Sequence, residues 1–309
     1  MPGMGYLFTM PVSFFAADFA SYEPKKWSSN AYTLERIKVK EKFQALCAAL
    51  SLPGTTAHLS DEFPNIVNNK KVEAQWLYFS RSPESAHELG KFLEKTELRP
   101  DKIFQLAPQD KHAILAVMLE QTRLRAGFFM HAGAWVDRRN LAAKLHHPWE
   151  REKLRAIFAH TAFDFGFEGD THPASEWSLD AFEALALQLP EDERRFILAR
   201  EWNPEEVMVE PALFETLQTT LHAAHAFYQF TTWSRDNDHT AVGEKIRQEK
   251  ADQRKNATGL KLGARVRISG GMFSGKIGVV QAIDTKANVK VQVGAMAVTV
   301  PNDDLTLMA

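Results

Sequence analysis

Residues 263–278 read Gly-Ala-Arg-Val-Arg-Ile-Ser-Gly-Gly-Met-Phe-Ser-Gly-Lys-Ile-Gly, and Val-Val-Gln-Ala-Ile-Asp follows directly. Residues 264–269 alternate between apolar and polar side chains, which is the pattern of a half-buried strand. Gly270, Gly271, Gly275 and Gly278 can adopt positive φ at little cost, so we expect them to form a tight turn before a second strand. This stretch decides the fold of the C-terminal part of the chain.

Three more segments rich in β-branched residues complete the pattern. They are residues 276–284, 289–293 and 298–300, with Gly, Asn and Asp between them. Four short strands of this kind indicate an all-β unit. Since so small a unit is only marginally stable, closing its sheet would help it, and we predict a β-barrel over residues 259–309.

Residues 261–307 closely resemble the KOW motif, which is found in the NusG family of transcription factors and in KOW-type ribosomal proteins. The matching positions are Val266, Ile268, Gly271, Phe273, Gly278, Val280, Ile283 and Asp284. Gly275, three residues before Gly278, is closer to the ribosomal version of the motif. The resemblance implies an SH3-like β-barrel.

The resemblance also implies a set of binding residues. In the family, aromatic and basic residues near this loop contact RNA, ribosomal protein or partners associated with RNA polymerase. Carried over to this sequence, they are Arg265, Arg267, Phe273 and Lys276. Two other interpretations stay open, because Phe273 can fold back to cap the barrel and the outward-facing arginines can simply be solvated.

The segment before the barrel differs from both of its neighbours. Residues 234–258 are dominated by charged side chains and predict a linker, partly helical and solvated. Residues 234–309 hold 12 Lys and Arg against 8 Asp and Glu, a net charge of +4, whereas residues 1–233 carry −6. An acidic body with a mildly basic tail is compatible with nucleic acid meeting the tail alone.

Residues 1–233 have mostly helical periodicity, and we predict a mostly α-helical domain of an α+β multidomain chain. The predicted helices cover residues 35–50, 85–94, 110–125, 148–163, 179–187 and 211–230. Residues 6–12 and 72–79 are strand candidates, and residues 163–169 look like a helix end that runs into a loop. Ser82 and Ser178 are placed as helix N-caps.

Composition limits the class of protein. The chain is 45% hydrophobic, enough for a sizeable core, and Cys47 is the only cysteine among 309 residues, so an intramolecular disulfide is impossible. The apolar stretch at residues 6–19 lacks the charged start and cleavage site of a signal peptide and is too short to cross a bilayer. We therefore expect a cytoplasmic protein with no membrane association.

Two constellations in the body carry weaker indications of chemistry. His222 and His225 share a helix face and could hold a metal if other helices supplied ligands, although eleven histidines make such pairs common by chance. Residues 65–80 mix amides, lysines and aromatic rings, which could contact phosphate and stack bases, or could be a turn leading into a buried strand. Five arginines could extend such a surface: Arg81, Arg123, Arg125, Arg138 and Arg139.

The sequence contains no Gly-x-Ser-x-Gly, Walker-type or Gly-x-Gly-x-x-Gly motif, so it gives little support to an enzyme and implies no cofactor. The leading hypothesis is a non-enzymatic binding protein of transcription or translation. It would dock on RNA, the ribosome or RNA polymerase through the KOW barrel. Two alternatives remain: an enzyme, perhaps acting on nucleic acid, with the barrel as a targeting module, or a purely protein-binding adaptor.

Overall fold

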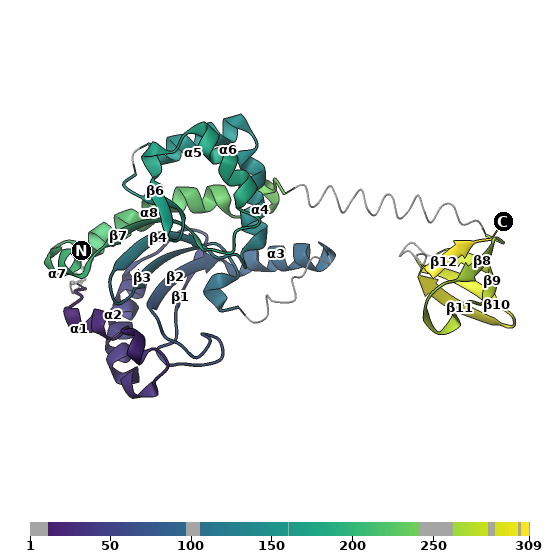
Figure 1. Cartoon of the computed structure of the whole chain (residues 1–309), viewed down its shortest axis with the longest axis horizontal. Coiled ribbons are helices and arrows are strands. Elements are labelled where there is room, and N and C mark those ends of the chain that lie inside the picture. Colours follow the sequence, from purple (N-terminus) through teal and green to yellow (C-terminus); the bar gives the residue numbers. More distant parts are fainter. Residues whose placement is uncertain are drawn as a thin grey trace, which may run out of the picture. The chain divides into compact units, whose positions relative to one another are not determined.

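The computed structural model describes residues 12–96, 106–159, 161–240, 262–283, 288–301 and 304–308. The chain divides into two compact units, Met1–Thr240 and Ala241–Ala309, which we call the N-terminal and C-terminal units. Helices and two antiparallel sheets confirm the predicted α+β class (Figure 1). Most of the strand candidate at residues 6–12 and most of the predicted linker lie outside the described residues.

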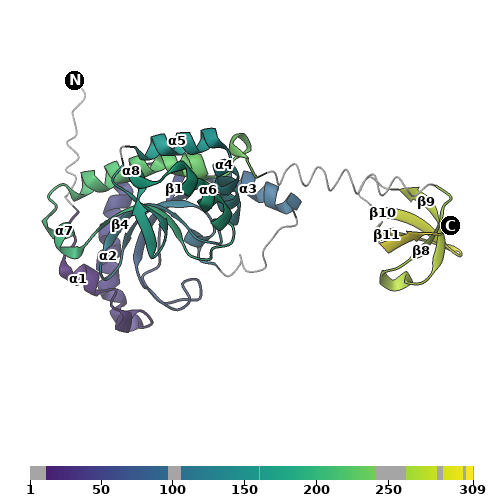
Figure 2. The ribbon, with the colours of Figure 1, turned by 45° about the horizontal axis from the view of Figure 1, so that its top comes forward.

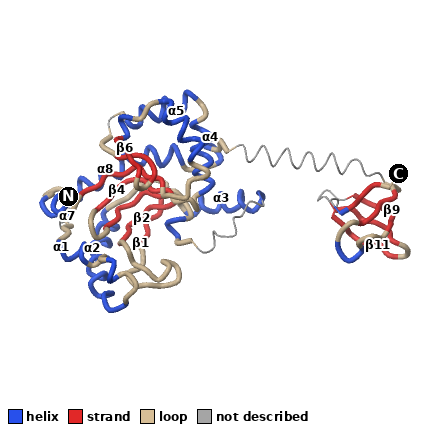
Figure 3. Tube along the Cα trace, viewed as in Figure 1, coloured by secondary structure: helices blue, strands red, loops and turns tan. Residues whose placement is uncertain are grey.

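The N-terminal unit is built on a seven-stranded antiparallel sheet of order β1-β2-β3-β4-β7-β5-β6. Figure 3 shows its strands gathered in the middle of the unit with helices around them. The strands are β1 (Thr55–Leu59), β2 (Gln75–Arg81), β3 (Ile114–Leu119), β4 (Leu124–Met130), β5 (Asp164–Phe167), β6 (Asp170–Pro173) and β7 (Phe196–Trp202). Helical residues outnumber strand residues, but the sheet forms the centre of the unit.

The predicted helix over residues 110–125 is wrong. The segment instead contains β3 and the start of β4, joined by a tight turn in which the Glu120 amide donates to the Arg123 carbonyl at 2.9 Å. Every residue of β3 and β4 is buried, because both faces of the sheet are covered at this point. A continuous apolar run of this kind has no period that separates a strand from a buried helix. The predicted helix end at residues 163–169 is likewise a strand, β5.

The other predicted helices are confirmed, with shifted ends. The described helices are α1 (Ala16–Ala20), α2 (Thr33–Ala49), α3 (Pro83–Thr96), α4 (Trp135–Leu145), α5 (Pro148–Phe158), α6 (Leu179–Gln188), α7 (Pro204–Val209) and α8 (Leu213–Thr231). Both predicted N-caps are present: the Ser82 hydroxyl accepts from the Ser85 amide, and the Ser178 hydroxyl accepts from the Ala181 amide at 3.1 Å. These bonds satisfy amides that a helix start leaves unpaired.

The main core lies between one face of the sheet and four helices, α2, α5, α6 and α8. Leu77 and Phe79 of β2 point into it from the strands, and Phe43 of α2 and Phe227 of α8 meet them from the helices. Figure 2 shows α8 running along the unit with α5 beside it. Side chains alternate along a strand, so the other face of β2 carries Trp76 and Tyr78 instead.

That second face has a smaller core of its own. Trp76, Met118, Phe129 and Ile197 are buried in it, and the Trp76 and Phe129 rings meet edge to face at 5.5 Å between centroids. It is continuous with a cavity at the end of β2, described below.

Residues 234–240 belong with the N-terminal unit, although their charge made them look like the start of a linker. The Asn237 side chain donates to the Thr232 carbonyl at 2.7 Å, and the Asn140 side chain accepts from the His239 amide at 2.8 Å. These bonds hold the segment against the end of α8 and the middle of α4. None of the helices among the described residues is long and apolar enough to cross a membrane.

The C-terminal unit is a five-stranded antiparallel sheet of order β11-β10-β9-β8-β12. Its strands are β8 (Arg265–Ile268), β9 (Ile277–Ile283), β10 (Asn288–Val293), β11 (Met296–Pro301) and β12 (Leu305–Leu307). The four predicted strands are confirmed, and β12 returns to pair with β8. Val266, Val280, Val289 and Val291 form the core on one face of this sheet.

Candidate functional site

Two regions carry the candidate functional residues, one in each unit. In the C-terminal unit, Arg265 and Arg267 are exposed on one face of β8, while Val266 and Ile268 are buried on the other. Arg265 lies opposite Val279 of β9, and Arg267 lies opposite Ile277. The alternation predicted for this strand is confirmed, and its outward face is the one that carries the arginines.

The surface around these arginines combines charge with exposed aliphatic groups. Ile277 is 40% exposed and Val279 is 39% exposed. Arg265 and Arg267 form no ion pair and no side-chain hydrogen bond with any residue that the structure describes. Each guanidinium group carries five N–H donors.

Phe273 and Lys276 lie in the turn between β8 and β9. The Ile268 amide donates to the Lys276 carbonyl at 2.9 Å, and the Gly275 amide donates to the Ile268 carbonyl at 2.7 Å. Phe273 is half-buried and Lys276 is exposed. The Lys276 backbone thus lies opposite Ile268, one position beyond the Arg267–Ile277 pair, with Phe273 on the same turn.

The glycines of this turn have two different functions. Gly271 and Gly275 have φ of 70° and 81°, as predicted. The same prediction is wrong for Gly270, whose φ is −128°, and for Gly278. A Cβ on Gly278 would lie 2.3 Å from a methyl carbon of Val291, so this glycine allows β9 to approach β10 closely.

The two histidines of α8 have different surroundings. His222 is exposed on α8, and His225 Nε2 lies 3.1 Å from the Pro53 carbonyl oxygen. Within the described part of the chain, no group of three His, Cys, Asp or Glu side chains could hold a metal ion.

Three of the five arginines considered for a nucleic-acid surface are buried: Arg81, Arg125 and Arg138. Arg138 donates to four backbone carbonyls and so ties α4 to the segment before β7. Arg125 contacts Glu120 at 3.1 Å and Glu168 at 2.8 Å. These side chains hold the N-terminal unit together and cannot extend a binding surface.

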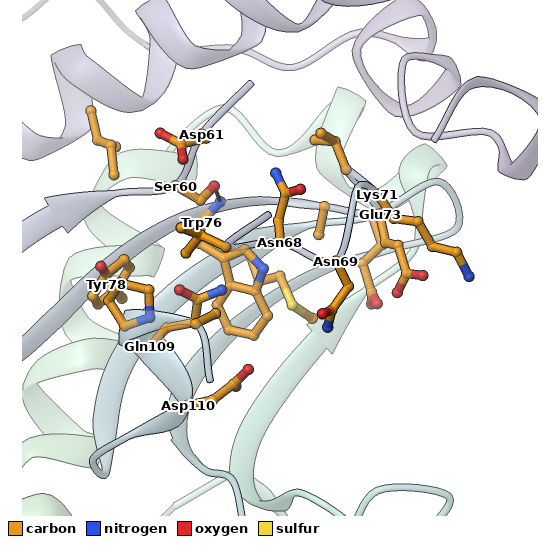
Figure 4. Close-up of a pocket in the computed structure, with 18 of the residues that line it drawn as sticks. Ser60, Asp61, Asn68, Asn69, Lys71, Glu73, Trp76, Tyr78, Gln109 and Asp110 are labelled. Carbon is orange, nitrogen blue, oxygen red and sulfur yellow. Dashed lines mark hydrogen bonds between the residues drawn. The ribbon is translucent and has the colours of Figure 1, made fainter. Parts of the chain in front are cut away.

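The second region is a cavity of about 550 Å³ on the Trp76 face of the N-terminal sheet. We call it the Trp76 pocket; its wall includes Ser60, Asn69, Trp76, Tyr78, Gln109 and Arg195. The loop between β1 and β2 forms one side, and the turn at Pro108–Asp110 forms another (Figure 4). Its volume lies in the range of small-molecule sites.

An arginine lies on the floor of this pocket. The Arg195 guanidinium is 5.1 Å from the centroid of the Trp76 ring. Asp110 at 3.1 Å and Glu168 at 3.7 Å hold it in place. Burial opposes the ionisation of Glu168, but Arg125, Arg195 and Arg123 outweigh it, so the pKa of Glu168 lies below its ordinary value.

A network of asparagines shapes the loop wall of the pocket. The Asn65 side chain accepts from the amides of Val67 and Asn68, and the Asn68 side chain accepts in return from the Asn65 amide at 2.8 Å. Asn69 and Lys70 follow with φ of 54° and 59°. Asparagine tolerates this left-handed conformation better than most residues, which suits Asn69 to its position.

Residues 65–80 were considered as a binding segment because of their amides and aromatic rings. Several of them line the pocket. Gln109 and Arg195 were missed, because the loops that carry them are distant in sequence and only the fold brings them together. Comparison with protein-family models gives no match, and comparison with curated proteins gives none either.

Proposed function

We propose that the C-terminal unit is a KOW-type, SH3-like barrel that docks this protein on RNA, in the setting of transcription or translation. The strand order supports this, since four consecutive strands pair in sequence and β12 returns to β8 beside the motif. The motif glycines also have geometric functions consistent with it, in the turn at Gly271 and Gly275 and in the close approach at Gly278.

The observation that carries the proposal is the outward face of β8. Two guanidinium groups, two residues apart on one strand, are exposed and unpaired among the described residues, and Lys276 is nearby. Arginines placed in this way suit phosphate oxygens, because their planar forks match the phosphate geometry. Ile277 and Val279 between them offer apolar contact to ribose or base.

In the proposed arrangement the barrel supplies one contact and the N-terminal unit a second. Joining two binding modules in one chain raises the effective concentration of the second contact. The ribosome and RNA polymerase are suitable partners because both present RNA and protein surfaces together. The protein would then act by binding and not by catalysis.

Salt-dependent RNA binding tests the proposal. We expect the full chain to bind single-stranded RNA, with log K falling as log salt rises. In the double variant Arg265→Gln, Arg267→Gln, the magnitude of that slope should fall by about 1.4, because each lost phosphate contact removes roughly 0.7. The control Arg155→Gln, Arg235→Gln removes two exposed arginines from the N-terminal unit and should leave the slope unchanged.

Affinity purification from cells, with and without nuclease, gives an independent test. Recovery of ribosomes or RNA polymerase that depends on Arg265 and Arg267 supports the proposal. A protein partner that is retained after nuclease, with no measurable RNA affinity of the pure protein, would favour the adaptor hypothesis instead. An RNA affinity that is equal in the double variant and the wild type would reject the assigned surface.

A further inference from the structure

The Trp76 pocket presents polar groups that the fold leaves unpaired. Trp76 is 8% exposed and Tyr78 is 6% exposed, so both side chains are more than nine-tenths buried. The indole N–H of Trp76 and the hydroxyl of Tyr78 have no hydrogen-bond partner among the described residues, and neither atom is sealed off from solvent. Because both atoms reach the cavity, they can form hydrogen bonds with a ligand there.

The pocket has an aromatic ring with polar side chains on two sides of it. In Figure 4 the Trp76 ring lies at the centre, with Asn68 and Asn69 on one side of it and Gln109 and Asp110 on the other. The guanidinium of Arg195 lies over the indole ring, and a planar ring can stack against this pair. The side-chain amides of Asn69 and Gln109 have no partner among the described residues and offer donors and acceptors at the edge of such a ring.

The charge of the lining narrows the class of ligand. The described lining of the pocket contains four acidic residues and two basic ones. The acidic residues are Asp61, Glu73, Asp110 and Glu120, and the basic ones are Lys71 and Arg195. Asp110 is paired with Arg195, and Glu120 is paired with Arg123 and Arg125. Asp61 and Glu73 form no ion pair with any described residue, so the lining keeps a negative charge, which disfavours a phosphate.

We propose that the Trp76 pocket binds a nucleobase as part of an uncharged nucleoside, stacked over Trp76 and Arg195 and read at its edge by Asn69, Tyr78 and Gln109. A nucleobase combines a planar ring with donors and acceptors on one edge, and amide side chains pair with such edges. This site is separate from the RNA-binding face proposed on β8, so either can fail without the other.

Isothermal titration of the full-length protein with adenosine, guanosine, cytidine and uridine in turn tests the proposal. At least one nucleoside should bind with Kd below about 1 mM, and its 5′-monophosphate should bind more weakly. A trinucleotide of the same base distinguishes a free nucleoside from an RNA base. Titrated into the variant Arg265→Gln, Arg267→Gln, so that the face on β8 does not contribute, it should bind more weakly than the nucleoside. Tighter binding of the monophosphate or the trinucleotide would contradict the proposed charge selectivity.

Three variants remove single polar groups with little change to the backbone. Tyr78→Phe removes only an unpaired hydroxyl, and Asn69→Gly removes the amide but keeps a residue suited to positive φ. Gln109→Ala is the third variant and removes the other amide. Each of the three single variants should raise the Kd for the bound nucleoside about fivefold to tenfold. Tyr32→Phe and Gln229→Ala make the same chemical changes outside the pocket and should leave Kd unchanged.

The thermal unfolding of each variant, compared with that of the wild type, verifies that the fold is intact. The proposal is overturned if none of the four nucleosides binds at millimolar concentration, or if the pocket variants bind like the wild type. It is also overturned if a cation such as spermidine binds in their place and loses affinity in the pocket variants.

Discussion

The buried guanidinium of Arg81 donates to the buried carboxylate of Asp137, and this pair joins β2 to α4. The same carboxylate accepts from the Ala113 amide at 3.1 Å and from the Trp233 amide at 2.9 Å. Arg81 in turn donates to the Trp233 carbonyl. One ion pair thus joins four segments: β2, α4, the residue before β3 and the residues after α8.

Replacing Asp137 with alanine should therefore be severe. It would leave the Arg81 charge and two backbone amides without their acceptor in a buried site, and losing one member of a buried pair costs about 3–5 kcal/mol. We expect the free energy of unfolding in urea to fall by that amount. Glu152→Ala breaks an exposed pair with Arg155 and should cost less than about 1 kcal/mol. Equal losses in the two variants would contradict this account.

Glu168 should make the stability of the N-terminal unit depend on pH at the acidic end. Its pKa is lower in the folded protein than the ordinary value of 4.5, because the arginines around it outweigh its burial. Its contribution is therefore complete above about pH 4.5 and is lost as the pH falls through the lower folded pKa. We expect Glu168→Gln to be less stable than the wild type at pH 7 and to approach it at pH 3. A stability gap that is the same at both pH values would argue against this.

Lys144 should give a dependence of the same sign at alkaline pH. Its ammonium group donates to the Phe230 carbonyl at 2.7 Å and lies 4.2 Å from the Phe230 ring centroid. Burial lowers the pKa of Lys144 from 10.5 to about 8. Between pH 8 and 10.5 the unfolded chain then holds a proton that the folded chain does not, so the free energy of unfolding rises with pH.

The gain over this range is at most on the order of 3 kcal/mol. It should be seen in urea titrations from pH 7.5 to 10.5 as a rising difference between the wild type and Lys144→Met. The exposed Lys38→Met serves as the control and should run parallel to the wild type. A wild-type curve parallel to that of Lys144→Met would show that this amine keeps an ordinary pKa.

Gly278→Ala should destabilise the C-terminal unit. The new methyl group would lie 2.3 Å from a Val291 methyl carbon and 2.7 Å from the Gln292 carbonyl oxygen, so β9 and β10 would have to separate. Overpacking of this kind costs about 1–3 kcal/mol. Gly294 has φ of 60° with nothing near its Cβ position, and Gly294→Asn should be tolerated. Amide hydrogen exchange of β9 and β10 in the full chain measures both effects.

The sequence predicted the C-terminal strands well because each has one buried and one exposed face. In β8, for example, Val266 and Ile268 are on the buried face, and Arg265 and Arg267 are on the exposed face. In β3 and β4 both faces are buried, so no alternation survives and the apolar run was assigned to a helix. The central sheet was missed for this physical reason.

The candidate sites were less predictable than the strands. Arg81 and Arg138 look like surface charges in the sequence, but an acid partner and backbone carbonyls distant in sequence allow them to be buried. The Trp76 pocket depends on Gln109 and Arg195, which reach it from separate loops. A contact between residues so distant in sequence leaves no local pattern that could predict it. The amides and aromatic rings of residues 65–80, in contrast, lie within one segment and could be noticed in the sequence.

The asparagine network of the β1–β2 loop has a consequence for recognition. Asn65 and Asn68 bond to each other's backbone, and Asn69 follows them in a left-handed conformation. The loop has therefore already lost its conformational entropy when the chain folds, and a ligand that contacts Asn69 need not order it again. The entropic cost of ordering this loop is thus part of the free energy of folding and does not weaken the binding of a ligand at this wall.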